Sequence, residues 1–370
     1  MVNVNTVHGR YQIIEGVLVC DSPQQNNSLG TKKMTVEEAV GSVLAHDITE
    51  IRPGEFKGRA FKKGHIIREE DVCYLQRLGK KNLFVLNIAD DEMHEDDAAY
   101  ALANALMGEG VRIKGEPKEG KINIVADTEG LLKINKDALL AFNMLGDVMC
   151  ATIHSNTIVK KDQTVAGTRA IPLIVKKHIV EAAVELGEQA GNIIQVYPIR
   201  KPRAGVVITG NEIYYGRIKD AFAPIIKNKI QGVGGEIVGI YYAPDAESFI
   251  ETRLRDLINA GADLLITTGG MSVDPDDVTR FAIRNLGAED ITYGSAVLPG
   301  AMVLAAYLGD IPIIGIPACG MCAKTTIFDL ILPRMLAGEK LGRRELAELG
   351  HGGLCLKCVE CNYPMCPFGK

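Results

Sequence analysis

The feature that most constrains this chain is a regular alternation of short apolar segments with amphipathic segments in its C-terminal half. Apolar, β-branched segments predict strands, and segments with helical spacing predict helices. Strands are expected at 204–210, 236–243, 262–268 and near 290 and 312, with helices at 221–233, 245–260, 276–286 and 323–336. Strands that alternate with helices indicate a parallel sheet covered on both faces. In such sheets ligands bind at the carboxyl ends of the strands.

The first 200 residues have a mixed pattern without an obvious repeat. Helices are expected to begin at the Thr35 N-cap of TVEEAV and to occupy 68–79, 95–108 and about 174–188, with β-like segments at 11–20 and between 117 and 174. The segment PIRKPRAG (198–205) carries two prolines and three basic residues, as linkers do. The predicted fold class is α/β. It consists of a mixed α+β region at 1–200, in one piece or two subdomains, a three-layer domain with a mostly parallel sheet at 203–340, and a Cys-rich tail at 341–370.

Composition excludes several classes of protein. The chain has 370 residues, of which 47% are hydrophobic, so it can bury sizeable cores. Its formal charge is −5 and its basic residues are scattered, which argues against nucleic acid as a partner. The longest apolar runs, such as the one near 301–307, are too short to span a membrane, and no signal-peptide pattern opens the sequence. We therefore expect a cytoplasmic protein whose nine cysteines do not form a disulfide framework.

Two polar loops follow the first two strands of the alternating half. In TGNEIYYGRIKDA, Thr209 and Gly210 can present backbone N–H groups, while Glu212 and Asp220 bring carboxylates to the same rim. In APDAE, Asp245 stands at a strand end. Glu212 could equally cap or anchor the helix that follows it, and for Asp245 taken alone a role as the N-cap of the next helix is the favoured interpretation.

The third loop, ITTGGMSVDPDDVTR, combines a glycine turn with three carboxylates. Backbone amides of 267–270 can approach a phosphate, next to the N-terminus of the following helix. Asp274, Asp276 and Asp277 cannot hold the same anion. They could bind Mg²⁺ that bridges phosphate oxygens, or accept hydrogen bonds from two adjacent N–H groups of a ring such as a pterin. The alternative is that all three only cap and solvate the helix start.

Two further loops complete the predicted rim. VLPGAM (297–302) contributes Pro299 and Gly300, and GIPACGMCAK (315–324) follows the last strand. Cys319 and Cys322 have C-x-x-C spacing before a helix, which would lower the pKa of a thiol and suits a redox or metal role. Two small buried hydrophobic residues are the favoured interpretation of this pair.

The order of these loops resembles the molybdopterin-binding domain of molybdenum cofactor biosynthesis proteins, over about 203–337. The layout is most similar to the molybdopterin molybdotransferase, which inserts molybdate into adenylylated molybdopterin with Mg²⁺. The resemblance implies that Glu212, Asp245 and Asp277 are acidic residues of the active site. It also implies that the cofactor's phosphate and pterin contact a group made of Thr268, Gly269, Gly270 and Ser272. A homodimer or other homo-oligomer, in which a partner's N-terminal region closes over the rim, is implied as well.

Three departures from the transferase pattern stand out. The family's P-P-x-x-x-S-x-x-D-G-Y-A stretch reads RPGEFKGRAFKKG (52–64), without its Ser and Asp. Its K-P-G-K-P has become LPGAM, which loses both lysines, and its G-L-P-G-N-P has become GIPACG. Loss of two cations and an Asn predicts weaker binding of phosphate and molybdate.

Two other functions therefore stay open. One is a non-catalytic carrier or sensor that binds molybdopterin and passes it to a partner molybdoenzyme. The other is a metal-dependent ADP-ribose pyrophosphatase, because the domain of the competence- and damage-inducible proteins has G-G-L-G-P-T-x-D-D in the third loop, which Asp276, Asp277 and Thr279 also fit. Met271 to Val273 follow the molybdopterin version more closely, and the many carboxylates favour cofactor maturation.

The last sixteen residues hold a cysteine cluster, formed by Cys355, Cys358, Cys361 and Cys366. Four thiolates in a Gly- and Pro-rich segment, which cannot pack a core without help, are a strong signal for a metal. The spacing C-x₂-C-x₂-C-x₄-C-P is close to the bacterial ferredoxin run, so an iron–sulfur cluster is favoured. Zinc, or a redox-active thiol cluster without metal, is the alternative.

Overall fold

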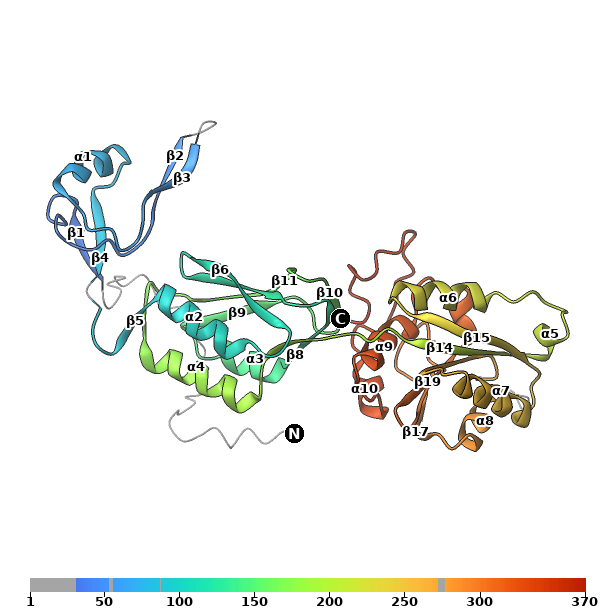
Figure 1. Cartoon of the computed structure of the whole chain (residues 1–370). Helices are drawn as coiled ribbons and strands as arrows, with labels where there is room; N and C mark the ends of the chain where they lie inside the picture. Colours follow the sequence, from blue (N-terminus) through green and yellow to red (C-terminus); the bar gives the residue numbers. More distant parts are fainter. Residues whose placement is uncertain (1–30, 53–55, 87, 272–276) are drawn as a thin grey trace. The chain divides into compact units, whose positions relative to one another are not determined.

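The computed structural model describes residues 31–52, 56–86, 88–271 and 277–370, and Figure 1 traces the whole chain. The chain divides into two compact units, one up to Ala89 and the other from Asp90 onward. Among the described residues, no helix combines the length and the apolar character that crossing a membrane requires. The domain boundaries expected from the sequence stay a prediction.

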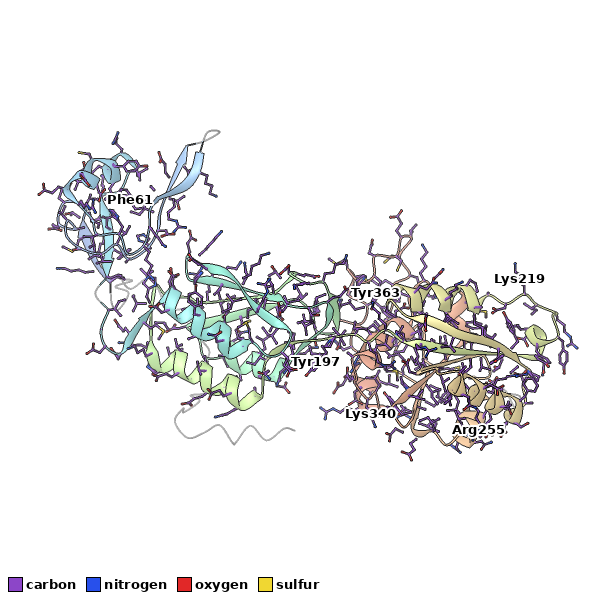
Figure 2. All side chains as sticks on the ribbon, viewed as in Figure 1. Phe61, Tyr197, Lys219, Arg255, Lys340 and Tyr363 are labelled. Atoms are coloured by element: carbon purple, nitrogen blue, oxygen red, sulfur yellow. The ribbon has the colours of Figure 1, made fainter. Side chains whose placement is uncertain are left out.

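The first unit is a small α+β fold with its own core. Its elements are β1 (Thr31–Thr35), β2 (Ile48–Arg52), β3 (Phe56–Phe61), α1 (Glu69–Arg77) and β4 (Asn82–Leu86). Strand β1 pairs with β4, and β2 pairs with β3, both antiparallel. Phe61, labelled in Figure 2, packs with Leu44, Ile67 and Leu75 in the core. Helix α1 confirms the helix predicted at 68–79.

The helix predicted to begin at Thr35 is wrong. Strand β1 ends at Thr35, and turns occupy the next residues up to Gly41. The capping contacts are nevertheless present: the amide of Thr35 donates to Glu38 Oε2 at 3.1 Å, and the amide of Glu38 donates to Thr35 Oγ1 at 3.3 Å. Gly41 then adopts a φ of 84°. Because Val43 bridges to Ile66 and Leu44 bridges to Val85 of β4 directly afterwards, the chain has no room to extend the capped turn into a helix.

The N-terminal part of the second unit packs helices against antiparallel sheets. Its elements are β5 (Glu92–His94), α2 (Glu95–Leu106), β6 (Val111–Lys118), β7 (Lys121–Ala126), β8 (Gly130–Ile134), α3 (Lys136–Asn143), β9 (Val148–Thr152), β10 (Thr157–Val159), β11 (Thr164–Ala170), β12 (Ile174–Lys176), α4 (Lys177–Ala190) and β13 (Ile194–Tyr197). Strands β6, β7, β11 and β9 form a four-stranded sheet. Buried alanines and leucines of α2, with Phe142 of α3, fill the core. The helix predicted at 95–108 is confirmed as α2.

The C-terminal part of the second unit is the predicted three-layer α/β domain. Its elements are β14 (Arg203–Thr209), α5 (Asn211–Tyr214), α6 (Phe222–Gly232), β15 (Glu236–Ala243), α7 (Glu247–Asn259), β16 (Leu264–Thr268), α8 (Thr279–Asn285), β17 (Glu289–Tyr293), β18 (Leu304–Leu308), β19 (Ile311–Ile316), η1 (Ala318–Met321), α9 (Ile327–Leu336) and α10 (Arg343–Glu348). The strand order is β15-β14-β16-β19-β18-β17, and the first four strands run parallel. The prediction of a mostly parallel sheet is therefore confirmed. Strand β18 was not predicted, and it runs antiparallel to both of its neighbours.

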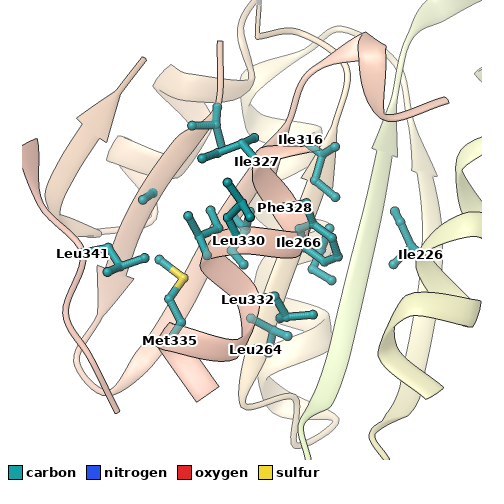
Figure 3. Close-up of a cluster of buried hydrophobic side chains, with 14 of the residues drawn as sticks. Ile226, Leu264, Ile266, Ile316, Ile327, Phe328, Leu330, Leu332, Met335 and Leu341 are labelled. Carbon is teal, nitrogen blue, oxygen red and sulfur yellow. The ribbon is translucent and has the colours of Figure 1, made fainter. Parts of the chain in front are cut away.

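Alternate side chains of the strands enter two cores, one on each face of the sheet. In β14, Val206 and Ile208 pack against α6 and α9, whereas Val207 packs against α7 and α8. Figure 1 shows α6 and α7 on opposite faces, and Figure 3 shows α9 within the first core. Nine of the ten residues of α9 are buried and Asp329 is partly buried, so this helix is enclosed on nearly every side.

Enclosure of α9 buries one cation, that of Arg334, which is 5% exposed. Glu339 receives its Nε at 2.9 Å and its Nη2 at 2.5 Å, and Lys133 Nζ reaches the same carboxylate at 2.9 Å. Burial acts to raise the pKa of Glu339, but the hydrogen bonds from Arg334 and Lys133 outweigh it and hold the pKa below its ordinary value. Glu339 therefore compensates the charge buried in α9.

We expect Glu339→Gln to lower the free energy of unfolding by about 2 kcal/mol at pH 7, because it leaves Arg334 buried without a counter-charge. Since the folded pKa is depressed, this contribution is present above the pKa of the unfolded chain and is lost as the pH falls through the folded pKa. The deficit of the variant, measured by urea titration at several pH values, should therefore shrink in acid. Glu348→Gln, which breaks an exposed pair with Arg344, is the control and should change little. A deficit that does not vary with pH would contradict this account.

Candidate functional site

The loops singled out in the sequence meet at one edge of the sheet. Because β14, β15, β16 and β19 are parallel, the loops that follow them leave from the same edge. Strand β18 runs the other way, so the segment that precedes it, 298–302, lies at this edge too. The unpredicted antiparallel strand thus explains why VLPGAM belongs to the rim.

A pocket of about 620 Å³ opens at this edge. Five residues predicted to form the site line it: Gly269, Gly270, Asp277, Pro299 and Gly300. The remaining lining residues come from the same loops and from the C-terminal segment, namely Met271, Leu298, Ala301, Met302, Pro317, Ala318, Cys319, Leu354, Cys355 and Lys357. The third, fourth and fifth loops of the predicted rim are therefore brought together by the fold.

Packing explains the two glycines of the turn. Gly269 and Gly270 have φ values of 80° and 60°, in the left-handed region. A Cβ atom on Gly269 would lie 2.5 Å from the carbonyl oxygen of Thr209, and one on Gly270 would lie 2.3 Å from Thr279 Oγ1. Only glycine fits this tight turn between β16 and α8.

Buried hydroxyl groups lie directly before the turn. Thr209 Oγ1 donates to the carbonyl oxygen of Thr268 at 2.8 Å and lies 3.2 Å from Thr279 Oγ1. Thr267 and Thr268 are fully buried, and their own hydroxyl oxygens have no hydrogen-bond partner among the described residues. An unsatisfied buried hydroxyl costs free energy, and an ordered water is the usual partner of such a group.

The first two loops are tied to each other by hydrogen bonds. The amide of Asn211 donates to Asp245 Oδ2 at 2.9 Å, and the amide of Asp245 donates to Asn211 Oδ1 at 3.3 Å. Asp220 accepts from the amides of Phe222 and Ala223, at 2.7 and 3.1 Å, and so caps α6. Asp220 therefore has a capping role, whereas Asp245 holds the start of α5 and is not the N-cap of α7, the helix that follows it.

Several predicted site residues do not line this pocket. Of the described residues, Thr209 and Thr268 lie buried behind the turn, Glu212 is exposed on α5, and Gly210, Asp220 and Asp245 belong to the neighbouring loops. Ser272, Asp274 and Asp276 lie outside the described residues. The catalytic and binding roles assigned to all of these positions stay predictions.

The C-terminal segment forms part of the pocket wall, which the sequence did not indicate. The amide of Leu298 donates to the carbonyl of Gly353, and the amide of Cys355 donates to the carbonyl of Leu298, both at 2.8 Å. This places Lys357 in the pocket, where LPGAM lacks the two lysines of the transferase pattern. The segment also packs against the domain: Phe368 is 3% exposed, and Tyr363, labelled in Figure 2, contacts the same core. The metal-binding role predicted for the four cysteines stays a prediction.

Comparison with known proteins identifies the domain that carries this pocket. Residues 205–337 match the family model described as "Probable molybdopterin binding domain". The chain therefore carries a domain of the molybdopterin-binding family. Residues 33–87, in the first unit, match a family described only as a domain of unknown function.

The relatives of the molybdopterin-binding domain are similar over part of their length. A CinA-like protein of Mycobacterium avium is 40% identical over 89 residues, which cover 23% of this chain and 20% of that protein. A CinA-like protein of Mycobacterium tuberculosis is 37% identical over 93 residues, covering 24% and 22%. The chain thus spans about a fifth of the length of the curated relatives it matches.

Two solved structures are each similar to part of the chain. The CinA protein of Thermoplasma acidophilum has 18% identity and a TM-score of 0.33, covering 36% of this chain and 98% of its own. The molybdopterin biosynthesis enzyme MoaB of Thermus thermophilus has 23% identity and a TM-score of 0.33, covering 37% and 98%.

Gly270→Ala tests the account of the turn. We expect it to lower the free energy of unfolding by about 1–3 kcal/mol more than Gly309→Ala does, because the added methyl group overlaps Thr279. Gly309 also has a positive φ, of 57°, but nothing lies within 4 Å of its Cβ position, so it isolates the backbone strain. Urea titration of both variants makes the comparison. Equal losses would show that the contact with Thr279 does not matter.

Proposed function

We propose that this protein acts in molybdenum cofactor maturation and binds molybdopterin, or its adenylylated form, in the pocket between the glycine turn, the 298–302 loop and Lys357. The observation that carries the proposal is the position of this pocket. It opens at the carboxyl edge of the sheet within a domain of the molybdopterin-binding family. A recipient molybdoenzyme and self-association into a homodimer belong to the same proposal.

The anionic part of such a ligand finds donors on one side of the pocket. Gly269 and Gly270 offer backbone close to the ligand, and Lys357 supplies a cation. A lysine from the C-terminal segment thereby compensates for the lysines that LPGAM lacks. A phosphate held by one lysine and uncharged donors binds through charge-assisted hydrogen bonds that weaken with salt.

The pocket also contains an acidic residue, which binds hydrogen-bond donors and cations rather than anions. Asp277 lines the wall and can accept hydrogen bonds from a pterin ring or bind Mg²⁺. In the transferase reaction, Mg²⁺ held by Asp277 would offset the phosphate charge while water cleaves the phosphate–phosphate bond and AMP leaves. Molybdate would bond separately to the two dithiolene sulfurs, with loss of an oxo ligand as water. Glu212 and Asp245 would support this chemistry from the neighbouring loops.

A carrier without catalysis is the second candidate, and a specific observation favours it. Asp245 links two loops and Asp220 caps α6, so two of the predicted rim carboxylates already have structural partners. A carrier needs only the pocket and a partner to which it passes the cofactor. A third candidate, hydrolysis of ADP-ribose with a divalent metal, draws support from the CinA-like relatives.

Lys357→Met is expected to weaken molybdopterin binding by about tenfold, because it removes a charged hydrogen bond to the phosphate worth about 1.5 kcal/mol. The loss should be smaller at high salt, since screening already weakens the wild-type contact. Fluorescence titration with molybdopterin measures both values. Lys227→Met, on the exposed side of α6, is the matched control. Undiminished affinity in Lys357→Met would remove this residue from the site.

Asp277→Asn separates the three candidates. If the protein inserts molybdate, AMP release from adenylylated molybdopterin depends on molybdate and Mg²⁺ and falls by at least about a hundredfold in this variant. Asp310→Asn, in the turn between β18 and β19 at the opposite edge of the sheet, should keep full activity. Pterin binding without AMP release would favour the carrier, and cleavage of ADP-ribose without pterin binding would favour the pyrophosphatase. Failure to bind either ligand would refute all three.

A further inference from the structure

A second pocket, of about 410 Å³, adjoins the first and is lined by six cysteines. Four come from the C-terminal segment, and Cys319 and Cys322 come from the loop after β19. None of the six forms a disulfide. The two groups lie far apart in the sequence, so the fold brings together thiols that the sequence analysis treated separately. Cys319 and Cys355 line both pockets.

Local geometry directs Cys319 and Cys322 to one side of their loop. Residues Ala318–Met321 form the 3₁₀ turn η1, and the amide of Cys322 donates to the carbonyl of Cys319 at 3.2 Å. A 3₁₀ turn has three residues per turn, so side chains three positions apart align. The pair is therefore arranged as a C-x-x-C metal knuckle would be.

The cysteines of the C-terminal segment are held against this loop. Thr325 Oγ1, on a side chain only 7% exposed, lies 3.2 Å from Cys361 Sγ. The amide of Cys355 is bonded to the carbonyl of Leu298, and Cys366 packs against the buried core beside Tyr363. Contacts at both ends of the segment thus fix its position next to Cys319 and Cys322.

The chemistry of the lining favours one class of ligand. Among the described residues around this pocket there is no Asp, Glu or His, so thiol groups are the metal ligands it offers. Thiolates select soft cations such as Zn²⁺, and iron in iron–sulfur clusters. Lys324 and Lys357 also line the pocket and would offset the negative charge of several thiolates.

We propose that this pocket binds a tetrathiolate metal centre to which Cys319 and Cys322 contribute as one C-x-x-C pair and the C-terminal segment contributes the other thiolates. Two C-x-x-C pairs separated by a long stretch of chain are the usual ligand arrangement of structural metal sites. Within the described part of the chain, no three His, Cys, Asp or Glu side chains yet stand close enough to hold a metal. The proposal therefore requires metal binding to draw the thiolates closer together, as is common in small metal sites.

The test uses the full chain, purified anaerobically and stripped of metal. It is titrated with Co²⁺, which reports tetrahedral thiolate ligation by its absorption, and in a separate arm with Fe²⁺ and sulfide. The double variant Cys319→Ser/Cys322→Ser should bind the preferred probe more than about tenfold more weakly, since even second-shell losses cost about 10–100-fold. Cys73→Ser, which removes an exposed cysteine of the first unit, is the control and should bind as the wild type does.

If the double variant folds poorly, mapping which cysteines of the wild-type chain react with an alkylating agent still tests the proposal. In the wild-type chain loaded with either probe, we expect Cys319 and Cys322 to be protected from iodoacetamide, whereas Cys73 reacts freely in the same sample. Protection of these two thiols by either probe supports the proposal. Protection by Co²⁺ indicates a zinc-type site, and protection by Fe²⁺ with sulfide indicates an iron–sulfur cluster. Unprotected Cys319 and Cys322, unchanged affinity of the double variant, or uptake of neither probe would overturn it. No pterin is present, so the outcome is independent of the proposed function.

Discussion

Two backbone hydrogen bonds, between Leu298 and the segment of Gly353 and Cys355, are the constraint on which both pockets depend. They place the C-terminal segment along the loop before β18, at the edge where the parallel strands end. They help to hold Lys357 and the four C-terminal thiols beside the glycine turn. The burial of Phe368 adds a hydrophobic anchor to the same segment, so its position does not rely on a few polar contacts alone.

The edge of the sheet also carries polar side chains whose hydrogen-bonding capacity is not satisfied. The hydroxyls of Thr267 and Thr268 are buried without a partner among the described residues, and the following glycines hold left-handed conformations. A fold optimised for stability alone would replace such threonines with valines, which have the same shape and no hydroxyl to satisfy. They stand directly before the glycine turn, and such local departures from stability are typical of functional sites.

Much of the α/β domain could be predicted because its signals are local. Strands such as β15 and helices such as α7 carry their periodicity in consecutive residues, and α2 carries its acidic start and glycine end. The failures concern tertiary contacts. The capped turn at Thr35 did not extend because bridges follow at once, and β18 had no polar alternation to reveal it. The glycine turn could be predicted because its signal is a run of consecutive residues. The position of Lys357 in the pocket, and the proximity of Cys319 to the C-terminal thiols, depend on contacts between residues distant in sequence.

The wall shared by the two pockets has a thermodynamic consequence. Cys319, Cys355 and Lys357 line both cavities, so any ligand that changes their positions on one side changes the surface offered on the other. Linkage requires this effect to be reciprocal: if filling one cavity strengthens binding in the other by some factor, the reverse holds by the same factor. The loop after β19 and the C-terminal segment therefore form a structural link between the two cavities. Through it, a ligand bound in one cavity can change the affinity of the other for its own ligand.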